Sequence, residues 1–244
     1  MELLPAQRDT RQLPAISQRR GQLTQRSIAS HDGVVVICDR DSAPAALRQL
    51  PFAALLQRLY QRAAERGPVE IPSTRVTPEA IPLIIGFAKG TASAFERLSH
   101  AARIWKELAT SAPRDVLFAT GGMAIRQSDA MLEAMLAAAL AGSVALPNLK
   151  SKPPRPAALS AITLIRDGAA LDLERSIAVH RGNHLARWLT TLPPNVLGSL
   201  NYRRALKTLA AQHGWGFSFL NEASLKRLGA GAFLAVTRAN GHPG

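Results

Sequence analysis

Residues 185–197 read LARWLTTLPPNVL, residues 201–215 read NYRRALKTLAAQHGW, and residues 225–241 read LKRLGAGAFLAVTRANG. A helical run ends at Pro193-Pro194, because proline lacks an amide hydrogen and restricts the preceding residue to extended geometry. The pattern then predicts a second helix, an aromatic strand at residues 215–219 and a Gly-rich turn. This order of elements predicts a connecting helix followed by the opening of a second α/β unit.

The stretch resembles the leucyl (cytosol) aminopeptidase family at the point where its linker helix leads into the catalytic domain. Members carry an N-x-P-P-N element, an amphipathic helix, a strand and an L-G-x-G-x-x-L-A-V run. The matching residues are Pro193, Pro194, Asn195, Leu228, Gly229, Gly231, Leu234, Ala235 and Val236. Trp188 and Thr191 stand where the family pattern has Asp and Asn. The chain is therefore interpreted as a divergent branch.

This resemblance implies a metallopeptidase. Family members use two divalent cations, commonly manganese or zinc, which activate a water and polarise the scissile carbonyl. The family's metal-binding runs, V-G-K-G-x-T-F-D-S-G-G and N-T-D-A-E-G-R-L, do not occur in this sequence. We therefore assign no catalytic, cofactor-binding or metal-binding residue, and expect a truncated family member that is inactive alone. For the complete enzyme, the resemblance implies a peptide substrate and a homohexamer.

Upstream of this stretch, apolar runs alternate with helical periods. Continuous apolar runs at residues 34–38 and 81–88 are typical of strands covered on both faces. Residues 115–120, which read DVLFAT, and residues 159–166, which alternate in part, predict two more strands. A spacing of three and four predicts helices at residues 52–66, 93–109 and from 128 onward, and later at residues 172–191, 199–213 and 221–229. The Pro-rich residues 151–156 predict a loop.

The predicted helix starts rest on particular side chains. Ser93 and Glu96 have the spacing of a capping box, and Ser128 and Ser199 are expected to cap their helices. Pro51 is expected in a first turn. The predicted inward face of the helix at 93–109 consists of Phe95, Leu98, Ala102, Trp105 and Ala109.

The alternation of strands and helices predicts an α/β domain whose mostly parallel or mixed sheet lies between helices. The resemblance implies that this domain is macrodomain-like. We expect an unassigned N-terminal arm or edge strand at residues 1–30, the macrodomain-like domain at 31–167, the linker helix and Pro-Pro-Asn turn at 168–195, and an incomplete opening segment of the catalytic domain at 196–244. One helix and one strand would leave an apolar face and an open edge in that segment.

Composition limits the class of protein. The 244 residues contain 47% hydrophobic side chains, but no apolar run approaches the ~20 residues that a transmembrane helix needs. The N-terminus lacks the basic start and apolar stretch of a secretory signal, so we expect a cytoplasmic protein without membrane partners. Cys38 lies in the apolar run VVVICD, which favours a core thiol over a nucleophile.

The formal charge of +13 suggests an alternative function. Such a field attracts polyanions, so the chain could be a stand-alone basic α/β module that binds nucleic acid or a nucleotide. Against a specific site, the arginines are scattered and only 5% of the residues are aromatic. A third hypothesis is a noncatalytic assembly partner that caps full-length subunits through Trp188 and residues 215–219.

Two motifs could carry a ligand. His180 and His184 have the i, i+4 spacing of a helical zinc pair, but the glutamate of H-E-x-x-H is absent, and a solvated polar face is favoured. Gly121-Gly122, between a strand and a helix, stands where an α/β sheet could cradle a phosphate. The full G-x-G-x-x-G is missing, which favours a structural turn.

Overall fold

The computed structural model describes residues 3–5, 13–65, 73–75, 80–148 and 159–238. The chain divides into two compact units between His184 and Leu185, within helix α7 (Glu174–Thr191). We call residues 7–184 the first unit, and residues 1–6 together with residues 185–244 the second unit. The domain boundaries expected at residues 30, 167 and 195 stay a prediction. The expected loop at 151–156 lies outside the described residues.

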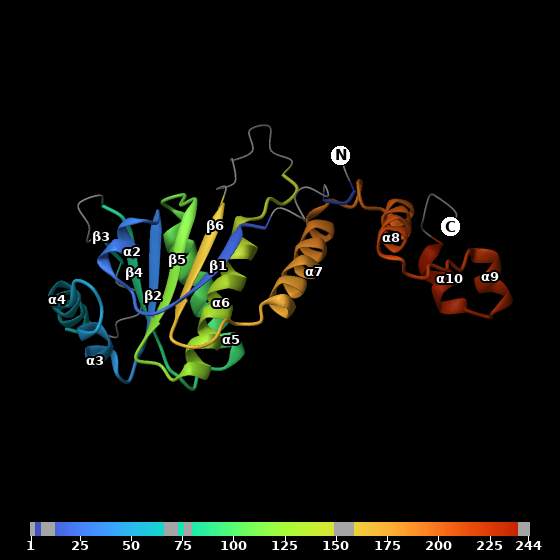
Figure 1. Ribbon diagram of the computed structural model, residues 1–244. Coiled ribbons are helices and arrows are strands. Elements are labelled where there is room, and N and C mark those ends of the chain that lie inside the picture. Colours follow the sequence, from blue (N-terminus) through green and yellow to red (C-terminus); the bar gives the residue numbers. More distant parts are fainter. Residues whose placement is uncertain (1–2, 6–12, 66–72, 76–79, 149–158, 239–244) are drawn as a thin grey trace. The chain divides into compact units, whose positions relative to one another are not determined.

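The first unit contains a six-stranded mixed sheet (Figure 1). Its strands are β1 (Ala15–Arg20), β2 (Gly33–Asp39), β3 (Ser73–Arg75), β4 (Pro82–Ala88), β5 (Asp115–Gly121) and β6 (Ala161–Arg166). Their order is β1-β6-β5-β2-β4-β3, and β3 alone pairs antiparallel with its neighbour. The predicted α/β class with a mixed sheet is confirmed.

Both faces of the sheet are buried, which explains the continuous apolar runs. Alternate residues of β2 point to opposite cores: Val35 and Ile37 pack with α5 (Ala94–Ala109) and α6 (Ile125–Ser143), whereas Val34, Val36 and Cys38 pack on the other face. That second face is covered by α2 (Gln25–Ala29), α3 (Ala43–Arg48) and α4 (Ala53–Ala64) (Figure 1). The sheet therefore lies between two helical layers.

Helix α5 confirms one sequence prediction and corrects another. Glu96 accepts a hydrogen bond from the Ser93 amide at 2.7 Å, and Ser93 Oγ accepts one from the Glu96 amide at 3.3 Å, so the capping box is formed. The predicted inward face was wrong at three of its five positions, because Phe95 is 79% exposed and Leu98 and Ala102 are also exposed. The buried face runs instead through His100, Ala101, Ile104, Trp105 and Leu108.

Three predicted helix starts were wrong. Helix α6 begins at Ile125, so Ser128 lies inside it rather than at its cap. Helix α4 begins after Phe52, which adopts a left-handed conformation with φ +63°, so Pro51 precedes the helix. In the second unit, Gly198 rather than Ser199 occupies the N-cap of α8 (Ser199–His213).

The regular secondary structure in the described residues of the second unit is helical. Helix α7 ends at Thr191, as the proline pair predicted, and α8 is followed by α9 (Glu222–Arg227) and α10 (Gly231–Thr237). The strand predicted at residues 215–219 is absent from these residues, and Trp215, Phe217 and Phe219 are exposed. A lone strand has no neighbour to pair with its backbone groups, so alternation alone could not form it.

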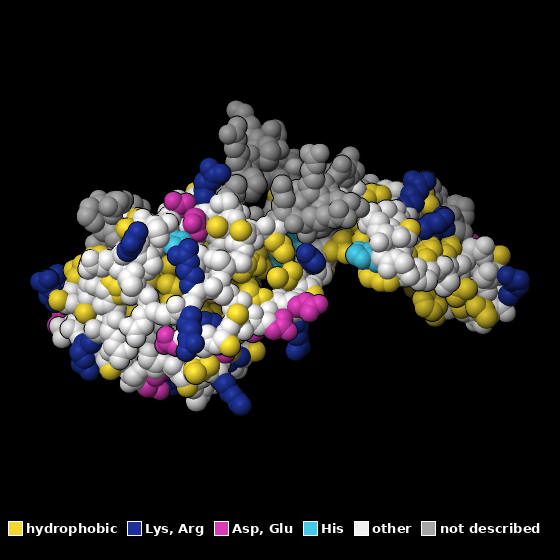
Figure 2. Space-filling view, viewed as in Figure 1, with side chains coloured by type: hydrophobic (Ala, Val, Ile, Leu, Met, Phe, Trp, Pro, Cys, Tyr) yellow, Lys and Arg dark blue, Asp and Glu magenta, His cyan; other side chains and the backbone are white. Residues whose placement is uncertain are grey.

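Buried apolar side chains are few in this unit. Leu192, Ala205, Leu209 and Ala210 are buried, whereas large apolar side chains at many other positions are exposed. Figure 2 shows yellow apolar side chains gathered across the visible face of α8, α9 and α10. Within the described ranges of the chain, no helix combines the length and the apolar composition needed to cross a bilayer.

Candidate functional site

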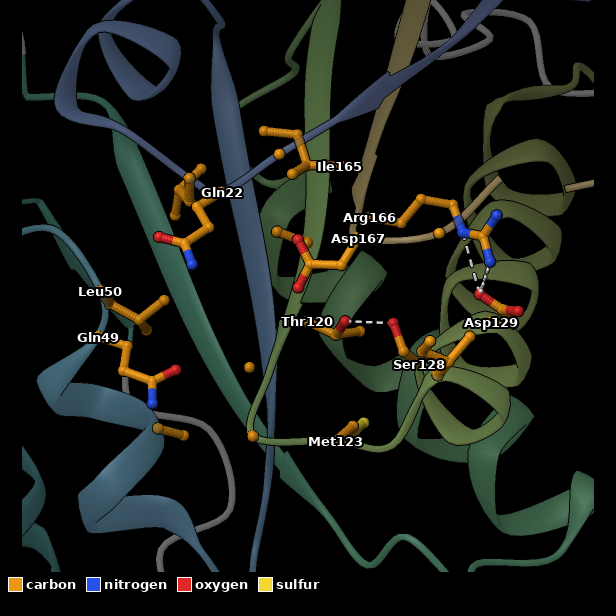
Figure 3. Close-up of a pocket in the computed structure, with 18 residues that line it drawn as sticks. Gln22, Gln49, Leu50, Thr120, Met123, Ser128, Asp129, Ile165, Arg166 and Asp167 are labelled. Carbon is orange, nitrogen blue, oxygen red and sulfur yellow. Dashed lines mark hydrogen bonds and ion pairs between the residues drawn. The ribbon is translucent and has the colours of Figure 1, made fainter. Parts of the chain in front are cut away.

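A pocket lies at the carboxyl edge of the sheet in the first unit (Figure 3). The chain leaves β2 toward α3 on one face and leaves the adjacent β5 toward α6 on the other, so β2 and β5 flank a topological switch point. In open α/β sheets, ligands bind outside the carboxyl ends of the strands at such a point. The pocket extends from there across the ends of β5, β6 and β1, and its cavity volume is about 100 Å³.

The lining of the pocket combines apolar and polar side chains. Leu23, Leu50 and Ile165 supply apolar surface. Polar side chains come from β5, β6 and α6, where Thr120 Oγ1 and Ser128 Oγ are hydrogen-bonded at 2.5 Å. Figure 3 shows the side-chain ends of Gln22, Gln49 and Asp167 turned toward the middle of the pocket. The arrangement can therefore hold a small molecule against apolar surface and several hydrogen-bonding groups.

A partly buried ion pair fixes the α6 side of the pocket. Arg166, at the end of β6, donates from Nε and Nη2 to Asp129 Oδ1 at 3.0 and 2.6 Å. The Arg166 side chain is 6% exposed and that of Asp129 is 24% exposed. A buried charge is tolerated when it is paired, so this pair joins the sheet to α6 and positions the pocket wall.

Gly121 and Gly122 lie at the pocket, as their place between strand and helix predicted. Gly122 has φ +68°, and a Cβ atom there would stand 2.7 Å from Ser42 Oγ and 2.9 Å from Ala46 Cβ. Ser42 Oγ also donates to the Gly122 carbonyl at 3.2 Å. These contacts favour the structural turn over a phosphate cradle, because they account for the glycine without a ligand.

Cys38 is a core residue. Its side chain is fully buried between β2 and the helices of the second face, and burial, followed by the charge of Asp39, raises the pKa of the thiol to about 12. A thiol that keeps its proton at neutral pH is a poor nucleophile. The expectation of a core thiol is confirmed.

The two histidines of α7 do not form a solvated face, and that prediction was wrong. His180 is 7% exposed and His184 is 2% exposed. Their rings stack with centroids 6.2 Å apart, and His184 Nε2 lies 3.3 Å from the Ala145 carbonyl oxygen. Burial of imidazole rings is common when their nitrogens are hydrogen-bonded, so residue type alone misplaced this face.

The described residues do not fit a two-metal centre. Among them, no group of three or more His, Cys, Asp or Glu side chains is arranged to hold a metal ion. The His180–His184 pair supplies two imidazoles, one of which lies against a backbone carbonyl. No step that uses a metal is therefore assigned to these residues.

Sequence reasoning missed the polar residues of the pocket. Gln22 and Asp167 closely follow β1 and β6, and Gln49 follows α3. The carboxyl ends of parallel strands meet at one edge, so the residues after predicted strands could have indicated this site. That signal was incomplete because β1 itself was not assigned.

Comparison with known proteins gives partial matches. No protein-family model matches the chain. The "Probable cytosol aminopeptidase" of Synechococcus sp. strain RCC307 is 32% identical over 84 residues, which are 33% of this chain and 17% of the relative. The protein of the same name from Exiguobacterium sibiricum is 32% identical over 82 residues, 34% of this chain and 17% of that relative. The matched segments are thus about a sixth of each relative's length.

Solved structures match over most of the chain. A mutant of tomato leucine aminopeptidase gives a TM-score of 0.69 at 16% identity, covering 96% of this chain and 50% of that one. Leucyl aminopeptidase from Trypanosoma brucei gives 0.57 at 13% identity, covering 91% and 46%. The bottromycin maturation enzyme BotP, solved in complex with Mn, gives 0.55 at 18% identity, covering 86% and 43%. At these identities the likeness establishes the fold, and this chain spans about half of each neighbour.

Proposed function

We propose that this chain is part of a leucyl aminopeptidase-like metalloexopeptidase that releases N-terminal residues from peptides. The resemblance to the leucyl (cytosol) aminopeptidase family, predicted from the Pro-Pro-Asn element onward, is confirmed by relatives named cytosol aminopeptidase and by solved leucine aminopeptidases. In this proposal residues 31–167 are a macrodomain-like N-terminal domain, residues 168–195 are the linker helix with the Pro-Pro-Asn turn, and residues 196–244 are the opening segment of the catalytic domain.

The apolar surface of the second unit is the observation that carries the proposal. Trp215 is 61% exposed, Phe233 is 69% exposed and Val236 is 81% exposed. Phe233 and Val236 lie in the stretch that resembles the family. Contiguous exposed apolar surface of more than a few hundred Å² marks a surface that packs against protein. The solved neighbours are about twice as long as the segments that this chain matches. We infer that this surface packs against the remainder of a catalytic domain.

Other properties of the family extend the proposal. Two divalent cations, manganese or zinc, would be held by groups outside residues 1–244, because the family's metal-binding runs are missing from this sequence. On this account the chain is inactive alone, and the complete enzyme is a cytoplasmic homohexamer. BotP in complex with Mn supports divalent-metal chemistry among the fold's neighbours.

A hybrid enzyme tests the proposal. This chain would replace the matching half of tomato leucine aminopeptidase, and hydrolysis of leucine p-nitroanilide with Mn²⁺ would be compared with that of the remaining tomato half alone. We expect the hybrid to be more active. A hybrid no more active than the tomato half alone would count against the proposal.

A matched pair of variants controls for the packing of the second unit. Leu209→Asp places a charge at a buried position of α8, and Thr208→Asp makes the same change at an exposed neighbour. The first substitution should abolish the gain in the hybrid, because an unpaired buried charge is strongly destabilising. The second should leave the gain in place.

The charge of the second unit keeps nucleic-acid binding as a second candidate. Its described residues carry the cations Arg187, Arg203, Arg204, Lys207, Lys226, Arg227 and Arg238 against the single carboxylate Glu222. Arg203 also lies over the exposed Phe219 ring, 4.3 Å from its centroid. Exposed aromatic rings beside cations suit base stacking. Duplex and single-stranded DNA binding across a salt titration tests this candidate, since no binding near physiological salt would remove it.

A further inference from the structure

We propose that the carboxyl-edge pocket of the first unit binds a small primary amine with an apolar side chain, such as the ammonium end of an amino acid or peptide. The proposal concerns binding only and does not depend on the peptidase function. It stands on the pocket's charge, on the direction of its polar groups and on its apolar lining.

The pocket is acidic within a basic protein. The lining contains two carboxylates, Asp129 and Asp167, and one guanidinium, Arg166, so its formal charge is −1, whereas the whole chain carries +13. Asp129 already accepts both donors of Arg166. The exposed Asp167 is the carboxylate left to meet a cation, and Figure 3 shows it turned into the pocket.

Neighbouring groups complement an ammonium that bears an apolar substituent. An ammonium has three donors, and Figure 3 shows two acceptors turned toward the middle of the pocket, the carboxylate of Asp167 and the amide oxygen of Gln49. Leu50 and Ile165 supply apolar surface elsewhere in the lining. One water needs about 10–15 Å³ of cavity. The pocket volume of about 100 Å³ is several times larger, so the pocket has room for the ammonium end of a small ligand.

A phosphate fits this pocket less well than an amine. The Ala124 amide at the start of α6 already donates to Gln127 Oε1 at 3.3 Å. The two carboxylates of the lining would repel an anion, and the guanidinium that could attract it is neutralised by Asp129. The electrostatics of the pocket therefore select for a cation.

Titration calorimetry and amide NMR on the full chain test this inference. The probes are L-leucinamide, which is cationic, N-acetyl-L-leucinamide, which is neutral, and inorganic phosphate. Leucylglycylglycine, compared with leucinamide, distinguishes a peptide end from a free amino-acid derivative. We expect leucinamide to bind and to shift the amides of Gly21, Gly122 and Gly168, which line the pocket. The acetylated probe and phosphate should bind at least tenfold more weakly.

A pair of charge variants localises the effect. Asp167→Asn should weaken leucinamide binding about tenfold, because a charge-assisted hydrogen bond is lost. Glu107→Gln removes the same charge from the exposed face of α5, away from the pocket, and should leave affinity unchanged. Three results would overturn the inference. Leucinamide could bind Asp167→Asn as tightly as the unmodified chain, or phosphate could bind more tightly than leucinamide. The third result is no leucinamide binding up to about 10 mM, a concentration tenfold above a Kd of about 1 mM for a weak ligand.

Discussion

Replacing Gly122 with alanine should destabilise the first unit through two separate effects. The residue has φ +68°, a conformation that costs an L-residue about 1–2 kcal/mol. The new Cβ would also stand 2.7 Å from Ser42 Oγ and 2.9 Å from Ala46 Cβ, so α3 must shift, and overpacking of this kind costs about 1–3 kcal/mol. Alanine restricts the unfolded chain and returns about 0.4–1 kcal/mol. The expected net loss is about 2–4 kcal/mol.

Gly182→Ala is the matched control, because it is the same substitution at a site without these contacts. Gly182 lies inside helix α7, and apart from its chain neighbours and the helix's own backbone no atom lies within 4 Å of the position its Cβ would take. Alanine is a better helix former, so this variant should be more stable by about 0.5–1 kcal/mol. The two substitutions are therefore expected to change stability in opposite directions.

Thermal unfolding followed by circular dichroism, with urea unfolding as a second measurement, checks the pair. For a unit of this size, 1 kcal/mol corresponds to about 2–4 °C in Tm, so Gly122→Ala should lower Tm by roughly 4–15 °C. An unchanged Tm for Gly122→Ala would refute the reasoning that this turn requires glycine for packing and conformation. Equal losses in both variants would refute the assignment of the effect to the local contacts.

Three further predictions concern the same unit. Burial raises the pKa of the Cys38 thiol to about 12, whereas its ordinary value is 9.0, so the thiol's contribution to stability is complete below pH 9 and is lost as the pH rises toward 12, by about 1.4 kcal/mol per pH unit. The difference in urea-unfolding free energy between the unmodified chain and Cys38→Ala should therefore change between pH 9 and pH 10. A constant difference would contradict this prediction. Asp129→Ala leaves the buried Arg166 without its carboxylate and should cost about 3 kcal/mol in the same assay, more than the isosteric Asp129→Asn. Ser93→Ala removes the side-chain acceptor at the start of α5 and should cost about 1 kcal/mol, which differential scanning calorimetry would detect as a lower Tm.

The central strands were predictable from sequence because both faces of the sheet are covered. Apolar runs such as residues 34–38 and 115–120 contain no polar alternation, and the structure buries them between two helical layers. β1 escaped prediction because it is an edge strand that reads AISQRR, with polar residues on its exposed side. β3 has three residues, too few for any period to appear.

Helical faces were harder to predict where tertiary packing overrides residue type. Phe95 and Leu98 fit an apolar stripe but are exposed, whereas His100 on the same helix is buried. His180 and His184 were assigned to solvent because they are polar, yet they stack within the first unit. The position of these faces depends on which layer each helix meets, and local periodicity does not contain that information.

The candidate site was predicted only through Gly121-Gly122. The two glycines follow a strand that was recognised, so their place at the sheet edge could be inferred. The residues that give the pocket its charge come from three different elements, β6, the segment after β6, and α6. Arg166 and Asp129 are 37 positions apart, and their ion pair depends on the pairing of β5 with β6 and the packing of α6.

The central claim is that this chain provides an aminopeptidase-like scaffold whose metal chemistry is supplied by groups outside it. The most direct test is the rate of leucine p-nitroanilide hydrolysis by the purified 244-residue chain with added Mn²⁺ or Zn²⁺. The account predicts a rate equal to that of the metal-only blank. Turnover that rises with chain concentration and disappears with a chelator would contradict it.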